Sequence, residues 1–335
     1  MVPGDKLPCA LLGATGLVGE RLARRLLDHP WFELTRVSAG AARVGRRWAD
    51  VAVEAELGAK GDLELQPQLP TGDAPPLVFS ALPEAQAAEV EAAWRAAGAC
   101  VISHATGHAR RPGVPLLVPE INAAHLDGFE ARRNCTTIGL SLALAPLAER
   151  FGLERVDAVT LQSLSGAGRA AVQAGLTDDL SAWIPDEEEC IRAQAPWILG
   201  RGDARQVEPA GFTIDASCHR VPIRHGHLIA CSVALCSKGS EAELLGAWRD
   251  FRGEPQRSSL PSAPAVPIEL CLEPEGPSPG QHLDAGGGQA ITIGRLRPCA
   301  SNHWRFSLLV DNLERGAAGN AVLSAELLRA RGLFA

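Results

Sequence analysis

The chain has 335 residues, of which 46% are hydrophobic and 21% are charged, and its net charge at pH 7 is −7. This length allows two domains of ordinary size, and the composition is that of a globular enzyme. The acidic balance argues against nucleic-acid or membrane-surface binding, and no apolar run approaches the ~20 residues that span a bilayer. The nine cysteines form no CxxC pair and no signal-peptide pattern opens the chain, so we expect a cytoplasmic protein with reduced thiols and no metal.

The first predicted unit surrounds a glycine-rich loop, GATGLVG, at residues 13–19. A short apolar strand at 8–12 precedes this loop, a helix at 18–26 follows it, and a second strand is predicted at 32–37. Glycines at such a turn let the backbone approach a pyrophosphate, which the N-terminus of the helix then binds. The pattern predicts a dinucleotide-binding unit.

The second predicted strand ends without the acidic residue that usually binds a ribose 2′-hydroxyl. Ser38 stands near this place, and Arg43, Arg46 and Arg47 follow it. Guanidinium groups suit a 2′-phosphate, so we expect the cofactor to be NADP. The alternative interpretation is a basic loop exposed to solvent.

The rest of the chain divides into two patterns. Strands at 76–80 and 99–103, with a helix at 85–97 between them, are typical of a doubly wound parallel sheet, which we expect to extend through about residue 134. Beyond it, alternating apolar residues predict a largely antiparallel sheet. Its expected strands are 156–161, 218–223, 227–235 and 289–296. Residues 260–288 are expected to be irregular, and a last helix at 317–331 to pack back on the first unit.

One cysteine has an unusual setting. Cys135 lies between two polar residues at the start of an apolar, helix-like stretch, and a helix N-terminus favours thiolate over thiol. Arg220 and His227 share a later segment, seven positions apart. On one continuous strand this odd separation would place them on opposite faces, so they can converge only if the chain bends at Pro222 or Gly226. A thiol, an imidazole, a guanidinium and a dinucleotide loop predict a cysteine acyl-enzyme that a nicotinamide cofactor reduces.

These motifs together resemble the aspartate-β-semialdehyde dehydrogenase family, in particular its archaeal and fungal branch, which also includes malonyl-CoA reductase-like paralogues. The similarity covers almost the whole chain. It is carried by GATGLVG at 13–19, VPLLVPEIN at 114–122, NCTTIG at 134–139, LQSLSGAG at 161–168, RVPIRHGH at 220–227 and RGAAG at 315–319. The resemblance implies an α/β fold. A doubly wound Rossmann domain of residues 1–134 is completed by a helix at 312–335, and 135–311 form an α+β catalytic and dimerisation domain with a mostly antiparallel sheet.

The resemblance also implies roles for single residues. Cys135 is the expected nucleophile, His227 the acid/base, and Gln162 the group that orients the reacting carbonyl. The expected substrate contacts are Arg220, which would clamp a carboxylate, Asn134, Glu187 and Arg110. Three consecutive glutamates begin at Glu187, which leaves the register at that place open. The expected cofactor contacts are Gly13, Thr15, Gly16, Leu17, Val18, Gly19, Ser38, Arg43, Ser80, Ala81, Leu82, Ser165, Gly166, Gly168 and Asn312.

Two departures from the family pattern concern the leaving group. Counting along the motifs places Ala109 and Cys190 where the family has an arginine and a lysine that bind phosphate. A contact between a cation and a phosphate is worth roughly 1–3 kcal/mol, so losing two would weaken phosphate binding by orders of magnitude. Arg110, by a one-residue shift, and Arg169 are the candidate replacements.

The expected activity is the NADP-dependent reductive dephosphorylation of L-4-aspartyl phosphate to L-aspartate-4-semialdehyde, and its reverse, by a homodimer or homotetramer. One alternative keeps the mechanism and changes the acyl donor to a malonyl-CoA-like thioester or to an acyl group of specialised metabolism. A second alternative is a non-catalytic dimeric relative. The expected partners are a small-molecule substrate and further copies of the chain, with no nucleic acid and no membrane.

Overall fold

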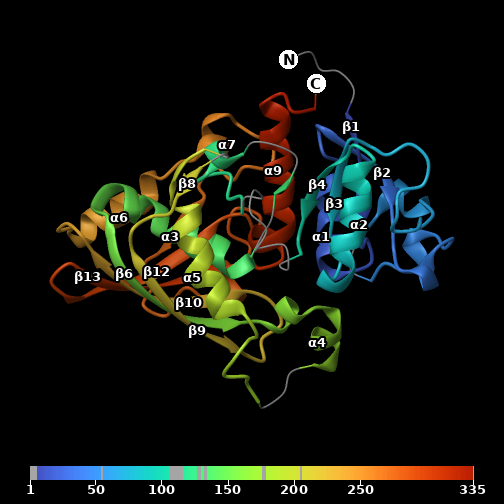
Figure 1. Ribbon diagram of the computed structural model, residues 1–335. Coiled ribbons are helices and arrows are strands. Elements are labelled where there is room, and N and C mark those ends of the chain that lie inside the picture. The colour runs from blue at the N-terminus through green and yellow to red at the C-terminus, as the bar shows by residue number, and fades with distance from the viewer. Residues whose placement is uncertain are drawn as a thin grey trace.

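The structure is a computed structural model that describes residues 6–53, 56–105, 116–126, 130–131, 134–175, 179–203 and 206–334. In Figure 1 the two large sheets occupy opposite sides of the molecule, and the C-terminal helix α9, in red, lies between them. The predicted fold class is therefore confirmed, whereas the domain boundaries at 134 and 311 stay a prediction. No helix in the described part of the chain is long and apolar enough to cross a membrane.

The first sheet has five parallel strands in the order β2-β1-β3-β4-β5. Every residue of β3 and β4 is buried, because helices cover both faces of the sheet, and such strands are continuous apolar runs. The bounds are β1 (Leu7–Leu12), α1 (Leu17–Leu26), β2 (Phe32–Val37), β3 (Leu77–Ser80), α2 (Glu84–Ala96), β4 (Cys100–Ser103) and β5 (Glu130–Ala131). The six elements predicted for this unit agree with these bounds to within one residue.

The C-terminal helix α9 (Gly319–Ala330) packs into the core of the first sheet. Val322, Leu323 and Leu327 are fully buried in the same apolar cluster as Leu22 of α1. The prediction of one regular helix from 317 is wrong at its start, because the turn Glu314–Ala318 is a π-helix. This turn contacts distant residues, which are described below.

The second sheet has six strands in the order β11-β12-β13-β10-β6-β9. Three neighbouring pairs are antiparallel, and β6–β9 and β11–β12 are parallel. Helices α3, α5 and α6 contribute to the core on one face of this sheet. On the other face Val159 and Leu161 of β6 are exposed. The bounds are α3 (Cys135–Phe151), β6 (Leu153–Gln162), α5 (Glu187–Ile198), β9 (Thr213–Arg220), β10 (His227–Leu235), α6 (Glu241–Asp250), β11 (Ile268–Cys271), β12 (Ile291–Ala300) and β13 (His303–Val310).

The remaining elements are short. They are α4 (Arg169–Ala174), the ladder of β7 (Arg201–Gly202) and β8 (Val207–Glu208), α7 (Glu254–Arg257), α8 (Pro279–His282), and single 3₁₀ turns. The prediction that residues 260–288 are irregular is wrong in part, because this stretch contains β11 and α8. Each has four residues, which is too short to leave a periodic pattern in the sequence.

The bend predicted between Arg220 and His227 is present. β9 ends at Arg220, three residues earlier than predicted, and β10 begins at His227. Pro222 lacks the N–H that a continuing strand would need, and Gly226 has a φ of 89°, in the left-handed region. The turn between the two strands brings both side chains to one end of the sheet.

Candidate active site

Cys135 is the first residue of α3, as the sequence predicted. Asn134 caps this helix, and its Oδ1 accepts a hydrogen bond of 2.8 Å from the backbone N–H of Thr137. The helix behind Cys135 is buried from Thr136 to Leu147, so it forms a rigid support for the thiol. Cys135 is half-buried as a residue and lies where the units built on the two sheets meet, next to the π-turn Glu314–Ala318.

His227 faces the sulfur of Cys135. Its Nε2 lies 3.4 Å from Sγ, and the imidazole is fully buried at the start of β10. On the other side of the ring, the backbone N–H of Ser163 donates to Nδ1 over 3.2 Å. Because Nδ1 accepts this bond, the neutral ring carries its proton on Nε2, and that N–H points at the sulfur.

The thiol and the imidazole are both uncharged at neutral pH. Burial, and then the charge of Glu187, raise the pKa of Cys135 to about 12. Burial, and then the charge of Arg220, lower the pKa of His227 to about 3. The expectation that the helix N-terminus would favour a thiolate is therefore wrong for the free protein. Burial outweighs the helix terminus, because a charged sulfur loses its hydration there.

Arg220 and the loop 163–168 surround the same space. Arg220 pairs in register with Gln162 of β6, and its Nη1 donates to the carbonyl oxygen of Ser163 over 2.8 Å. A Cβ on Gly166 would lie 2.6 Å from Nη1 of Arg220 and 3.4 Å from Nε2 of His227. Glycine at this position thus leaves room for the guanidinium and the imidazole to share one pocket wall.

Glu187 is the glutamate of the three that enters the site. Its two carboxylate oxygens accept hydrogen bonds from Nε2 of Gln162, at 3.0 Å, and from Nδ2 of Asn134, at 3.2 Å. Glu188 instead accepts from the backbone of Cys218, and Glu189 pairs with Arg192 at the surface. Local sequence could not settle this register, because it depends on which side of α5 faces α3.

The glycine loop forms a cradle that fits a dinucleotide. Gly13 has a φ of 72°, and a Cβ on it would lie 2.7 Å from the carbonyl oxygen of Ala81. A Cβ on Gly19 would lie 2.1 Å from the carbonyl oxygen of Gly13. The hydroxyls of Ser38 and Ser80, at the ends of β2 and β3, are buried without a hydrogen-bond partner among the described residues. Glycine is needed at both positions because the backbone passes too close for a Cβ, and the two buried hydroxyls beside the loop suit a ligand with polar groups.

Beside the cradle lies an apolar cavity of about 640 Å³. Its lining includes Ala39, Val44, Leu69 and Val90. Arg43, in the 3₁₀ turn Ala41–Arg43 that follows β2, donates from Nη1 to the hydroxyl of Thr15 in the glycine loop. A guanidinium therefore lies against the glycine loop, close in sequence to Ala41 and Val44 of the cavity lining.

The remaining predicted cofactor residues divide into two groups. Gly16, Leu17 and Val18 lie in the loop and the first turn of α1, and Leu82 follows β3 beside Ala81. Ser165, Gly166 and Gly168 lie on the catalytic side, where Asn312 holds the segment together. Its Oδ1 accepts from Ser165 and from the backbone N–H of Gly226, at 3.2 and 2.9 Å. The contact of Asn312 with a cofactor stays a prediction.

Four positions were considered for phosphate binding, and two of them are placed by the structure. Arg110 and Ala109 lie outside the described residues. Cys190 is on α5 one turn after Glu187, so it brings no cation to that turn. Arg169 pairs with Glu20 of α1, at 2.9 Å between Nη2 and Oε1. Its guanidinium is thus engaged with the dinucleotide-binding helix.

Sequence reasoning missed three residues of this region, which are Ser163, Glu20 and Gly316. Ser163 orients His227, Glu20 holds Arg169, and Gly316 contacts Cys135. Two of them lie inside stretches already singled out, LQSLSGAG and RGAAG. Their position within those motifs was the only hint that the sequence offered. Their contacts could not be predicted, because they join segments that are far apart in sequence.

Fold and site together define a two-domain oxidoreductase with a dinucleotide cradle and a cysteine–histidine pair. The chain belongs to the semialdehyde dehydrogenase family. Residues 8–129 match the family model "Semialdehyde dehydrogenase, NAD binding domain", and residues 144–315 match "Semialdehyde dehydrogenase, dimerisation domain". The chain is an enzyme of the aspartate-semialdehyde dehydrogenase type, as the sequence predicted.

Relatives and solved structures agree with this assignment. An aspartate-semialdehyde dehydrogenase of Archaeoglobus fulgidus is 37% identical over 95% of this chain and 96% of its own length. A malonyl CoA reductase (NADP) of Metallosphaera sedula is 31% identical over 97% of this chain and 98% of its own. The crystal structure of the Candida albicans aspartate semialdehyde dehydrogenase with NADP superposes with a TM-score of 0.87 at 27% identity, covering 98% and 99% of the two chains.

Proposed function

We propose that this enzyme converts L-4-aspartyl phosphate to L-aspartate-4-semialdehyde and phosphate with NADPH, and catalyses the reverse, through an acyl-enzyme on Cys135. The observation that carries the proposal is the contact of 3.4 Å between Cys135 Sγ and His227 Nε2, with Arg220 and Glu187 beside it. The aspartate-semialdehyde dehydrogenases among the relatives support the choice of substrate.

The charges around Cys135 favour an amino acid as substrate. Arg220 supplies a cation for a carboxylate, and Glu187 supplies an anion for an ammonium group. Their charges interact with each other and with the thiol between them. A malonyl group has a carboxylate but no ammonium group. It would therefore offer no cation to the Glu187 carboxylate, and its negative charge would be repelled by that of Glu187. The arrangement thus supports an aspartyl substrate over a malonyl one.

The residues of the chain suit each chemical step. In the reductive direction the sulfur of Cys135 attacks the acyl carbon, the thiol proton leaves with the phosphate, and a thioester remains on sulfur. Bound NADPH supplies the hydride that reduces this thioester. The Nε2–H of the neutral His227 would donate a hydrogen bond to the oxygen anion of the thiohemiacetal, which then collapses to the aldehyde and the Cys135 thiolate. Gln162 and the loop 163–168 orient the carbonyl.

The cofactor proposal rests on the cradle and on Arg43. Gly13, Gly19, Ser38 and Ser80 would hold the dinucleotide, and Arg43 would pair with a 2′-phosphate. The related Candida albicans structure was solved with NADP, which supports the same choice. The prediction is that Arg43→Ala raises KM for NADP⁺ about tenfold or more and leaves KM for NAD⁺ within about twofold. Equal changes for both cofactors would remove Arg43 from the 2′-phosphate site.

One alternative donor has a specific observation in its favour. Cys190 brings no cation to the turn of α5 where phosphate binding was expected, and a thioester donor would not need that cation. The test is NADP⁺ reduction with L-aspartate-4-semialdehyde in the presence of phosphate or of coenzyme A. Saturating dependence on phosphate supports the aspartyl phosphate reaction, whereas dependence on coenzyme A alone supports the thioester paralogue. Turnover that survives Cys135→Ala would sink both.

We also propose that the enzyme is a homodimer that pairs through the second sheet. Its open face carries the exposed Val159 and Leu161 beside a shallow cavity of about 400 Å³, and the family model for this unit is a dimerisation domain. Exposed apolar side chains on one face of a sheet favour a partner surface that covers them. Light scattering should give a dimer mass for the wild type and a monomer mass for Val159→Asp, and a monomeric wild type would refute this arrangement.

A further inference from the structure

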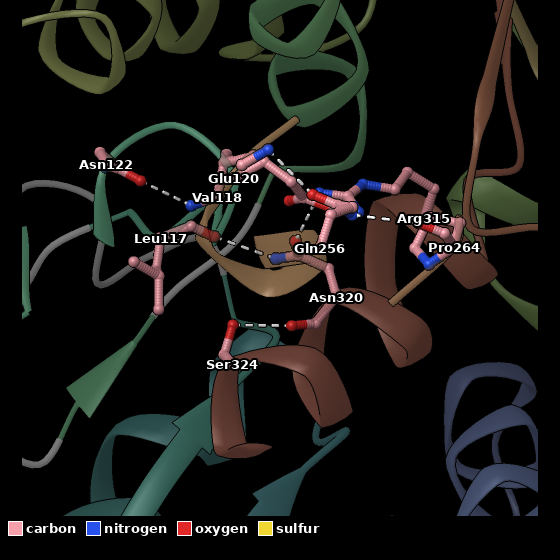
Figure 2. Close-up of polar contacts among 10 residues, drawn as sticks. Leu117, Val118, Glu120, Asn122, Gln256, Pro264, Arg315, Asn320 and Ser324 are labelled. Carbon is pink, nitrogen blue, oxygen red and sulfur yellow. Dashed lines mark hydrogen bonds and ion pairs between the residues drawn. The ribbon is translucent and has the colours of Figure 1, made fainter. Parts of the chain in front are cut away.

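A buried ion pair outside the reacting groups lies close to Cys135 in space. Arg315 and Glu120 are fully buried, and the guanidinium donates to both carboxylate oxygens, at 2.7 and 2.6 Å. Figure 2 shows the two side chains facing each other across the space between the loop at Val118–Asn122 and the start of the C-terminal helix. The two residues are separated by 195 positions in the sequence.

Neighbouring polar groups hold both members of the pair. Arg315 also donates to Oδ1 of Asn320, at 3.2 Å, and Nδ2 of Asn320 donates to the carbonyl oxygen of Leu117, at 3.0 Å (Figure 2). Gln256 approaches Oε1 of Glu120 at 3.5 Å and donates to Pro264. Desolvation makes a buried ion pair a poor source of stability unless its geometry is good. Such a pair is better suited to hold two segments in one arrangement.

The segment that carries Arg315 is the π-turn Glu314–Ala318. Three consecutive residues of this turn contact three different parts of the molecule. Glu314 pairs with Arg21 and Arg25 of the dinucleotide-binding helix α1. Arg315 pairs with Glu120, and Gly316 packs directly on the nucleophile. A π-turn is rare, and where it occurs it frequently lies at a functional site.

The contact between Gly316 and Cys135 is close. A Cβ on Gly316 would lie 2.5 Å from Cβ of Cys135 and 3.0 Å from its Cα. The backbone of the π-turn therefore forms the wall against which the base of the Cys135 side chain rests. This wall limits where Cβ of Cys135, and the sulfur bonded to it, can lie.

We propose that the Glu120–Arg315 ion pair is a positioning device for the nucleophile: it fixes the π-turn so that Gly316 holds the Cys135 sulfur opposite Nε2 of His227. This inference rests on the proposed role of Cys135. Glu120 and Arg315 are positioning residues, because they act through Gly316. Arg21 and Arg25 of α1 pair with Glu314 in the same turn. The turn therefore contacts both Cys135 and the helix of the glycine loop.

The test removes the pair without leaving a buried charge. Glu120→Leu combined with Arg315→Met replaces both partners by apolar residues of similar length. The matched control is Glu254→Leu with Arg331→Met, which removes a second two-bonded arginine–glutamate pair that is partly exposed and joins α7 to the end of α9. For each protein, iodoacetamide alkylation of Cys135 is followed by peptide mapping, together with kcat, KM and the dissociation constant of NADPH.

We expect the alkylation rate and kcat of the double variant to fall about tenfold or more below the control, with KM and NADPH affinity within about twofold. A folded double variant with both rates equal to the control would overturn the proposal. If it does not fold, Gly316→Ala, which leaves the ion pair intact, decides the question by the same two rates. Alkylation needs no turnover, so it tests the positioning separately from the proposed function, which turnover by Cys135→Ala would contradict.

Discussion

At the scale of single residues, the site holds a neutral thiol and a neutral imidazole that share one hydrogen bond. Burial is the first cause of both pKa shifts, upward for Cys135 and downward for His227. The charge of Glu187 adds to the first shift and that of Arg220 to the second. The free enzyme thus keeps its nucleophile protonated. In the proposed reaction the substrate's ammonium group would neutralise Glu187, and this would remove one of the two causes that raise the pKa of Cys135.

The pH profile of alkylation tests this state. With a pKa of about 12 for Cys135, only the small thiolate fraction reacts at neutral pH. The rate of Cys135 alkylation in the free protein should therefore rise about tenfold per pH unit, with no plateau below about pH 10. Peptide mapping is needed because Cys236 and Cys299 are exposed and also react. A plateau near neutral pH would show a thiolate–imidazolium pair and contradict the assignment.

Glu187→Gln should have two effects of opposite sense. Removing the carboxylate charge lowers the pKa of Cys135, so alkylation at pH 8 should become roughly threefold to tenfold faster. The same change removes the partner of the substrate's ammonium group, so KM for L-aspartate-4-semialdehyde should rise. The control is Glu189→Gln, two residues on and paired with Arg192 at the surface, which should change neither quantity. Slower alkylation in Glu187→Gln would contradict the electrostatic account.

At the scale of elements, the residue that caps α3 also holds a side chain of the proposed site. Asn134 accepts from Thr137 through Oδ1, as a capping side chain does, and donates to Glu187 through Nδ2. The same amide thus begins the helix that presents Cys135 and holds the carboxylate beside it. The loop 163–168 has a similar double role, because its backbone binds both Arg220 and His227.

Asn134→Ala should lower the free energy of unfolding by about 1 kcal/mol, the usual cost of losing an N-cap. Because the amide also holds Glu187, it should in addition raise KM for the semialdehyde. Ser240→Ala is the matched control, since Ser240 caps α6 through a hydrogen bond to Glu243 and lies outside the site. Its stability loss should be similar, with kinetics unchanged. Equal kinetics in both variants would restrict Asn134 to a structural role.

At the scale of the whole molecule, the C-terminal helix makes the first unit dependent on the last residues of the chain. α9 supplies buried residues to the core of the first sheet, and the π-turn before it touches α1, the loop at Glu120 and Cys135. This continuous segment is therefore one of the places where the two units meet, and it contacts the proposed nucleophile. This arrangement is visible in Figure 1, where α9 lies between the sheets.

Leu323→Ala tests this dependence. Leu323 is fully buried in α9, and truncating such a side chain should lower the free energy of unfolding by about 2–5 kcal/mol. Urea denaturation should show this loss of stability. NADPH binding should also weaken at urea concentrations near the midpoint of unfolding. Leu272→Ala is the control, because Leu272 is 75% exposed and its truncation should change stability by less than about 0.5 kcal/mol. A loss that small for Leu323 would show that α9 does not stabilise the first sheet.

Much of the first unit was predictable from local pattern. Its strands are buried on both faces, so each is a continuous apolar run. Its loop needs glycines for a tight turn, so together these patterns predicted the elements to within one residue. The position of Cys135 at the start of α3 was predictable for the same kind of reason, since a cysteine between polar residues before an apolar helix is a local feature. β11, α8 and the π-turn were not predictable, because four- and five-residue elements owe their form to contacts with distant segments.

The sequence therefore contained the fold class, the dinucleotide loop, the thiol and the bend between Arg220 and His227. Only the tertiary structure could decide which of three glutamates faces the thiol, which ring nitrogen of His227 carries the proton, and that burial keeps Cys135 protonated. It alone could join Glu120 to Arg315 and Gly316 to Cys135. The physical reason is that hydrogen-bond geometry and desolvation depend on what surrounds a group in space, and those neighbours are distant along the chain.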